Sequence, residues 1–244
     1  MKKIIFSLMC GVLLLGIATG CENSTFGKDD SKANNITINA PEGLEVKTYI
    51  SNSERQLIVS VTNKSGEIVG SGYMNISYYD ENNNELDTWG STSQRYNMLE
   101  SGKETVFGFE LPIENASRYY VPAKTEVEIT IDEEYQKGYV KQISEYEEKF
   151  SYSHTDDGSV ITVNITNNSN HSEFMPRHIS TVFYKNNKPI YTRDSIMGGT
   201  LGAGEVKTKT VEIPKDYKKS KETGEDVLLD YDSIKIFRVV EGNS

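Results

Sequence analysis

Oxygen-bearing side chains alternate along one short segment in the way that a calcium-binding loop begins. Asp80, Asn82 and Asn84 could converge on a hard cation. Such a loop then needs a glycine and, at its twelfth position, an acidic residue, whereas this chain has Glu85 and Ser91 there. We therefore predict a hairpin turn at this segment and no metal site.

Histidine is the other side chain with a capacity for metal chemistry. His154, His171 and His178 are separated by seventeen and then seven residues. Zinc sites usually take two ligands that are close in sequence, or a cysteine pair, so we interpret these histidines as ordinary surface and strand residues. The chain has no nucleophile elbow, and its glycine-rich segment 198–204 lacks the lysine of a phosphate-binding loop. No cofactor is predicted.

Aromatic side chains are plentiful, with fifteen tyrosines and one tryptophan in the chain. Tyrosine and tryptophan at exposed sites supply contact area for proteins or sugars. Trp89, Arg95 and Tyr96 are the candidate binding residues, because they are residue types enriched at binding hot spots and lie in a segment that does not match the internal repeat described below. The alternative is that Trp89 and Tyr96 pack at the rim of a core.

Cys21 is predicted to be modified covalently at its thiol. Two lysines precede an apolar run from Ile4 to Ala18, and residues 18–21 are Ala-Thr-Gly-Cys. A basic start followed by an apolar run and small residues is the layout of a secretory signal, and the run is short for a membrane span. The segment resembles a bacterial lipoprotein signal, with alanine where leucine is commoner. The resemblance implies cleavage before Cys21, lipid attached to its sulfur, and a protein anchored in the cell membrane on the extracytoplasmic side.

Composition narrows the classes of partner. Cys10 leaves with the signal and Cys21 carries lipid, so the mature chain has no free thiol or disulfide. The net charge of −10 at pH 7 becomes −12 when two lysines leave with the signal. A chain this acidic gains nothing from counterion release on phosphates, so no nucleic-acid partner is predicted. Attachment to the membrane is expected to rest on the acyl chains.

A duplication organises the chain beyond its polar N-terminal stretch. The sequence LIVSVTNKS at 57–65 returns as ITVNITNNS at 161–169, an offset of 104. Further on, LESG at 99–102 returns as LGAG at 201–204, an offset of 102. Because several blocks recur in one order at nearly one offset, the sequence indicates two copies of a domain of about 100 residues.

Within each copy apolar residues alternate with polar ones, as in half-buried antiparallel strands. Met74, Ile76 and Tyr78 alternate with more polar neighbours, and turn-forming residues separate such runs. No stretch shows a 3.6-residue stripe. The sequence therefore predicts an all-β protein with two tandem immunoglobulin-like antiparallel β-sandwich domains.

The block ISYYD at 76–80, which precedes an asparagine-rich turn, resembles the signature of small immunoglobulin-like modules of the FxLYD type. The second copy has TVFYK at 181–185, which departs further from that pattern. The resemblance implies an immunoglobulin-like fold in an exported protein of Gram-positive type. It implies no functional residues.

The predicted organisation has five parts and one notable loop. The parts are a signal peptide (1–20), a lipidated flexible tether (21–36), the first domain (37–135), a connector (136–144) and the second domain (145–241). Residues 215–230, charged and rich in lysine, are predicted to form a solvated loop.

We expect a non-enzymatic binding or interaction module whose ligand is a protein or a glycan at the cell surface. Two other classes stay open: a cell-envelope hydrolase with a site between the domains, and a structural spacer or accessory subunit. A convergent acid–base set between the domains would favour the enzyme. An exposed aromatic patch would favour binding. If both features were absent, the spacer would be the remaining class.

Overall fold

The structure is a computed structural model. It describes residues 35–51, 55–88, 91–96, 99–115, 118–119, 122–131, 148–155, 158–168, 178–196, 198 and 201–239. Strands dominate this part of the chain, and their pairing is antiparallel except between the first strand and the ninth. The predicted all-β fold is confirmed.

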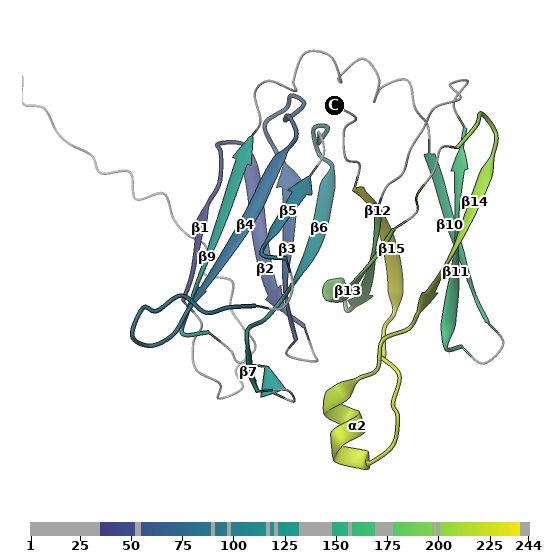
Figure 1. Ribbon diagram of the computed structural model, residues 1–244. Helices are drawn as coiled ribbons and strands as arrows, with labels where there is room; N and C mark the ends of the chain where they lie inside the picture. Colours follow the sequence, from purple (N-terminus) through teal and green to yellow (C-terminus); the bar gives the residue numbers. More distant parts are fainter. Residues whose placement is uncertain are drawn as a thin grey trace, which may run out of the picture.

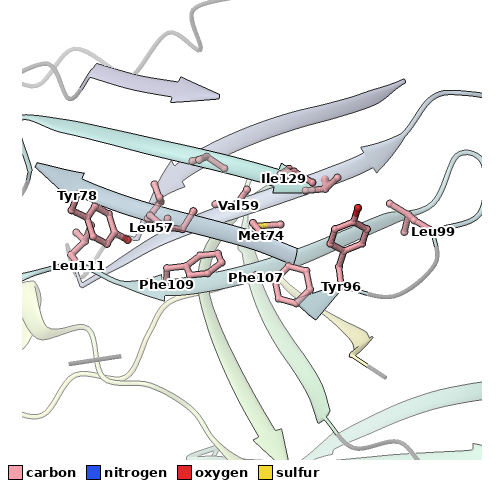
Figure 2. Close-up of a cluster of buried hydrophobic side chains, with 13 residues drawn as sticks. Leu57, Val59, Met74, Tyr78, Tyr96, Leu99, Phe107, Phe109, Leu111 and Ile129 are labelled. Carbon is pink, nitrogen blue, oxygen red and sulfur yellow. The ribbon is translucent and has the colours of Figure 1, made fainter. Parts of the chain in front are cut away.

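The first half of the described chain, residues 35–131, contains two facing sheets. Its strands are β1 (Asn35–Asn39), β2 (Leu44–Ile50), β3 (Gln56–Asn63), β4 (Gly72–Tyr79), β5 (Ser93–Tyr96), β6 (Glu104–Glu110), β7 (Ile113–Asn115), β8 (Arg118–Tyr119) and β9 (Lys124–Ile131). One sheet has the order β1-β9-β4-β5 and the other β2-β3-β6, while β7 and β8 form a separate pair. Side chains such as Leu57, Met74 and Phe109 fill the space between the sheets (Figure 2).

The second half, residues 148–239, is also built from two sheets. Its strands are β10 (Glu148–His154), β11 (Val160–Asn167), β12 (His178–Lys185), β13 (Lys188–Ile196), β14 (Val206–Glu212) and β15 (Ser233–Val239). The sheet orders are β10-β11-β14 and β13-β12-β15. Ile161, Val163 and Phe183 belong to the buried cluster that both sheets share.

The two halves repeat the same strand pairing. In each half one sheet has a central strand, β3 or β11, that pairs with the strand before it, β2 or β10, and with β6 or β14. The register agrees as well, because Ile58 lies opposite Gly108 and Thr162 lies opposite Thr210. The other sheet likewise has the order β9-β4-β5 in one half and β15-β12-β13 in the other. Among the described strands, the first half adds β1 to this sheet and has the separate pair β7-β8.

A buried asparagine makes the same contact in each half. The side-chain amide of Asn63 donates to the carbonyl oxygen of Leu99 at 2.7 Å, and that of Asn167 donates to the carbonyl oxygen of Leu201 at 3.1 Å. The offsets of these pairs are those of the sequence blocks in which they lie. The repeated Thr-Asn-x-Ser block therefore ends a central strand and ties it to the loop before β6 or β14.

The halves pack against each other, sheet on sheet. The face of the β2-β3-β6 sheet that points away from the first core packs against the face of the β13-β12-β15 sheet that points away from the second core. The four sheets therefore stack side by side (Figure 1). Ile58 and Val106 pack there with Val182 and Tyr184. As a result β3 is buried on both faces, whereas its alternating sequence predicted a half-buried strand.

The segment 215–230, which was predicted to be a solvated loop, contains a helix, α2 (Tyr217–Thr223). Asp216, which is buried, accepts a hydrogen bond from the backbone N–H of Lys219, and Gly224 ends the helix with a φ of 74°. An isolated bridge joins Lys215 to Leu228, and Leu229 lies in the second core. Most of the described side chains of 215–230 are exposed, as predicted, but the segment is not all loop. The helix was missed because seven residues are too few to show a periodic apolar stripe.

Several predicted parts lie outside the described residues. They are the signal peptide (1–20), nearly all of the tether (21–36), the connector (136–144), Cys21 and Trp89. Within the described part of the chain, no helix has the length and apolar character needed to cross a membrane.

Candidate functional site

Strand β5 carries two of the three predicted binding residues and sends their side chains in opposite directions. Neighbouring residues of a strand point to opposite faces of its sheet. Arg95 lies opposite Tyr73 on the face that points away from the core, and its guanidinium is 5.7 Å from the centre of the Tyr73 ring. Tyr96 points inward, and the solvent does not reach its side chain.

Tyr96 is therefore a core residue, and its assignment as a binding residue is corrected. Its hydroxyl donates to the carbonyl oxygen of Thr130 at 2.8 Å, and burial raises the pKa of the phenol. Gly72 makes this approach feasible, because a Cβ there would lie 1.8 Å from the same carbonyl oxygen and 2.8 Å from the Tyr96 hydroxyl. An aromatic side chain in this position supports the fold and is closed to a surface ligand.

The face that carries Arg95 is polar and aromatic, and we call it the outer face. Its members are the outward-pointing side chains of β4, β5 and β9: Tyr73, Asn75, Ser77, Tyr79, Ser93, Arg95, Lys124, Glu126 and Glu128. Tyr73 is 42% exposed. The side chains of Ser93 and Asn75 are joined by a hydrogen bond of 2.7 Å.

A second tyrosine on the outer face also has a cation over its ring. Lys124 Nζ lies 5.0 Å from the centre of the Tyr79 ring and 2.6 Å from Glu126 Oε1, and Tyr79 donates to Glu126 Oε2 at 3.2 Å. The hydrogen bond between Lys124 and Glu126 raises the pKa of the lysine and lowers that of the carboxyl. Exposed ion pairs are worth about 0–1 kcal/mol, so a ligand can exchange these groups for its own.

The outer face has the chemistry of a recognition surface. Aromatic rings offer stacking area, and the two cations and two carboxylates offer donors and acceptors on one flat sheet. Nothing in these contacts resembles an activated nucleophile or a pair of carboxylates with separated pKa values. Of these residue types, tyrosine and arginine are the ones enriched at protein contacts.

The space between the halves, where an enzyme site was the alternative, is filled. Ile58, Val106 and Val182 pack together at its centre. At its edge Glu104 accepts hydrogen bonds from Ser60 at 2.7 Å and from Lys235 at 3.4 Å. The described side chains at this contact therefore leave no room for a substrate at its centre.

In the turn that resembled the start of a calcium loop, the carboxylate oxygens of Asp80 accept hydrogen bonds from within the turn. Asp80 Oδ1 accepts from the backbone N–H groups of Asn82 and Asn84, at 2.8 Å each, and Oδ2 accepts from the Asn84 side chain at 2.9 Å. The hydrogen bonds from Asn84 lower the pKa of Asp80. Asn83 has a φ of 62°, and Tyr79 bridges Glu85 across the turn. The predicted hairpin is confirmed.

Of the three histidines, the structure describes the side-chain contacts of His154. His154 Nε2 lies 2.5 Å from the hydroxyl of Tyr231, and Tyr152 meets the same imidazole edge to face. His178 is the first residue of β12, and His171 lies outside the described residues. Over that part of the chain, no three His, Cys, Asp or Glu side chains gather as metal ligands would.

Sequence reasoning missed Tyr73, Tyr79 and Lys124. The alternation of β4 contained the signal for both tyrosines, because Met74, Ile76 and Tyr78 are apolar and buried and their neighbours must point outward. Lys124 could not be found in this way, since it lies on β9 and meets Tyr79 only through strand pairing.

Comparison of the sequence with protein-family models and with curated proteins returns no match.

Proposed function

We propose that this chain is a lipid-anchored, extracytoplasmic binding protein without enzymatic activity, and that it contacts a cell-surface protein or glycan through the outer face. The observation that carries the proposal is the pair of tyrosines, Tyr73 and Tyr79, each with a cation over its ring on the same face of one sheet. The lipoprotein-like N-terminus supports the location. The repeated strand pairing supports two tandem immunoglobulin-like domains of the FxLYD type.

A spacer is the second candidate, and the contact between the halves favours it. Gln56 Nε2 donates to the backbone carbonyl of Thr192 at 3.2 Å, and the backbone N–H of Thr192 donates to Gln56 Oε1 at 3.1 Å. These two bonds and the apolar cluster beside them hold the halves in one arrangement. A rigid pair of this kind would present a partner at a set distance from its attachment point.

The double variant Tyr73→Ala/Tyr79→Ala is expected to weaken partner binding by about 1–3 kcal/mol, because it removes both stacking platforms from the outer face. Retention of the mature protein would be measured on immobilised cell-wall glycan and on solubilised envelope protein. Tyr152→Ala is the matched control, since Tyr152 is 41% exposed but lies on β10. A thermal melt of each variant shows whether the fold is retained.

Trp89→Ala belongs in the same experiment, because it separates a contact residue from a packing residue. Weaker binding with an unchanged melting temperature would support Trp89 as part of the site. A lower melting temperature with unchanged affinity would remove it. Equal losses in the Tyr152→Ala control and the double variant would contradict the assignment of binding to the outer face.

Cys21→Ser is expected to release the protein from the membrane fraction or to leave an uncut precursor. The thiol is the group that accepts the diacylglyceryl unit in lipoproteins that this N-terminus resembles, and a hydroxyl would not replace it. Membrane fractionation and the mass of the mature chain provide the measurement. Normal processing with unchanged membrane association would overturn the lipid anchor and leave the binding proposal standing.

A further inference from the structure

The contact between the halves joins unlike faces of like units. The first half contributes the outward face of β2-β3-β6, and the second contributes the outward face of β13-β12-β15. The equivalent faces, on β10-β11-β14 and on β9-β4-β5, are the two ends of the stack. A head-to-tail contact of this kind does not close on itself, so in principle each end could accept another molecule in the same way.

The docked face of the first half has an apolar patch and a glycine that allows a close approach. Ile58 and Val106 are fully buried in the contact. Gly108, opposite Ile58 in the register, has no side chain, and a Cβ there would lie 1.8 Å from Thr192 Oγ1. A larger residue at 108 would therefore force the Thr192 side chain to move, because the Cβ would also lie 3.1 Å from the Cβ of Thr192.

The equivalent end face of the second half has a hydroxyl at each of these positions. The shared register places Thr162 at the position of Ile58, Thr208 at that of Val106 and Thr210 at that of Gly108. Thr208 and Thr210 are exposed. A side chain at residue 210 fills the space into which Thr192 would have to fit.

The end face of the first half is also more polar than the docked face of the second half to which it corresponds. Val182 lies opposite Lys235 on β15, and the equivalent pair in the first half is Ser77 opposite Glu126. Phe237, which packs against the contact, corresponds to Glu128. If the end face of the first half docked in the way that the β13-β12-β15 face does, the carboxylate of Glu128 would be buried without a partner. Burial of an unpaired carboxylate is strongly unfavourable.

We propose that the docked pair of faces is a recognition interface for like units, and that Ser77, Glu128, Thr162, Thr208 and Thr210 restrict it to the contact within one molecule. The partner that fits each docked face is another unit of this chain. The polar residues at the two ends stop the stack at two units and keep separate molecules from joining into open-ended chains.

Two variants of the chain from residue 22 onward test this. The first-end variant carries Ser77→Val and Glu128→Phe, and the second-end variant carries Thr162→Ile, Thr208→Val and Thr210→Gly. Each copies the docked residues onto one end. In analytical ultracentrifugation the natural sequence and each variant alone are expected to be monomeric. An equimolar mixture is expected to form a one-to-one complex, and a chain with all five changes is expected to form oligomers that grow with concentration.

The matched control retains Thr210 and carries only Thr162→Ile and Thr208→Val beside the first-end variant. It is expected to form a weaker complex than the full second-end variant, because Thr210 adds a side chain where the docked face has Gly108. A mixture of folded variants that stays monomeric would overturn the proposal. Self-association of the natural sequence through these faces would overturn it as well.

The reciprocal variant covers the case in which the five changes disturb folding. Ile58→Thr, Val106→Thr and Gly108→Thr copy the end-face residues onto the docked face, in a chain with a protease site introduced between residues 136 and 144. After cleavage the halves of the natural sequence are expected to co-elute in size exclusion, and those of the variant to separate. Separation of the natural halves, or co-elution of the variant halves, would contradict the assignment.

Discussion

Leu111→Asp is expected to unfold the first half of the chain at room temperature. Leu111 follows β6, is fully buried, and packs beside Leu57 and Tyr78 in the first core (Figure 2). A carboxylate there has no partner to compensate for the loss of water, and such substitutions cost more than about 4 kcal/mol. That is a large part of the 5–15 kcal/mol by which domains are typically stable.

Ile213→Asp is the matched change in the second half, where Ile213 lies in the second core. Each variant is expected to lose the half that carries it first, because the two cores are separate clusters. The other half should persist with a lower melting temperature, since it loses the contact made by Ile58 and Val182. Circular dichroism and limited proteolysis distinguish the halves.

The conservative variant Leu111→Met controls for position, and it is expected to cost less than about 1.5 kcal/mol because the volume is nearly unchanged. If either aspartate variant lost both halves in a single step, the chain would behave as one cooperative unit with a shared core. The expectation that each half unfolds separately would then be wrong.

Asn63→Ala is expected to destabilise the first half by about 2–4 kcal/mol, measured by urea unfolding. The Asn63 amide donates to the carbonyl oxygens of Glu67 and Leu99, and its oxygen accepts from the backbone N–H and the hydroxyl of Ser65. Each net hydrogen bond contributes about 0.5–1.5 kcal/mol. The whole side chain is buried, so water cannot replace these bonds.

Asn63→Asp separates the two parts of this network. Aspartate retains the acceptor for Ser65 but loses the donor to Leu99, and it adds a buried charge, so it is expected to be at least as destabilising as alanine. Asn167→Ala should destabilise the second half through the same contact with Leu201. A loss below about 0.5 kcal/mol in Asn63→Ala would show that the network contributes little to stability.

The sequence by itself determined the features that depend on neighbouring residues. Alternation placed Met74, Ile76 and Tyr78 in the core, because the side chains of a strand point to opposite faces in turn. Turn composition located the hairpins, and Asn186 and Asn187 both take the positive φ, 51° and 61°, that a tight two-residue turn requires. The repeat predicted matching blocks, and the strand pairing is the same in both halves.

Only the tertiary structure decided which of the two faces of each strand is covered and by what. Ile58 is fully buried because another sheet lies on it, whereas its equivalent Thr162 is partly exposed at the end of the stack. Tyr96 faces the core and Arg95 the outer face, although both lay in the same predicted site. The physical reason is that period-two alternation separates two faces without saying which surfaces meet. That depends on contacts between strands far apart in the chain.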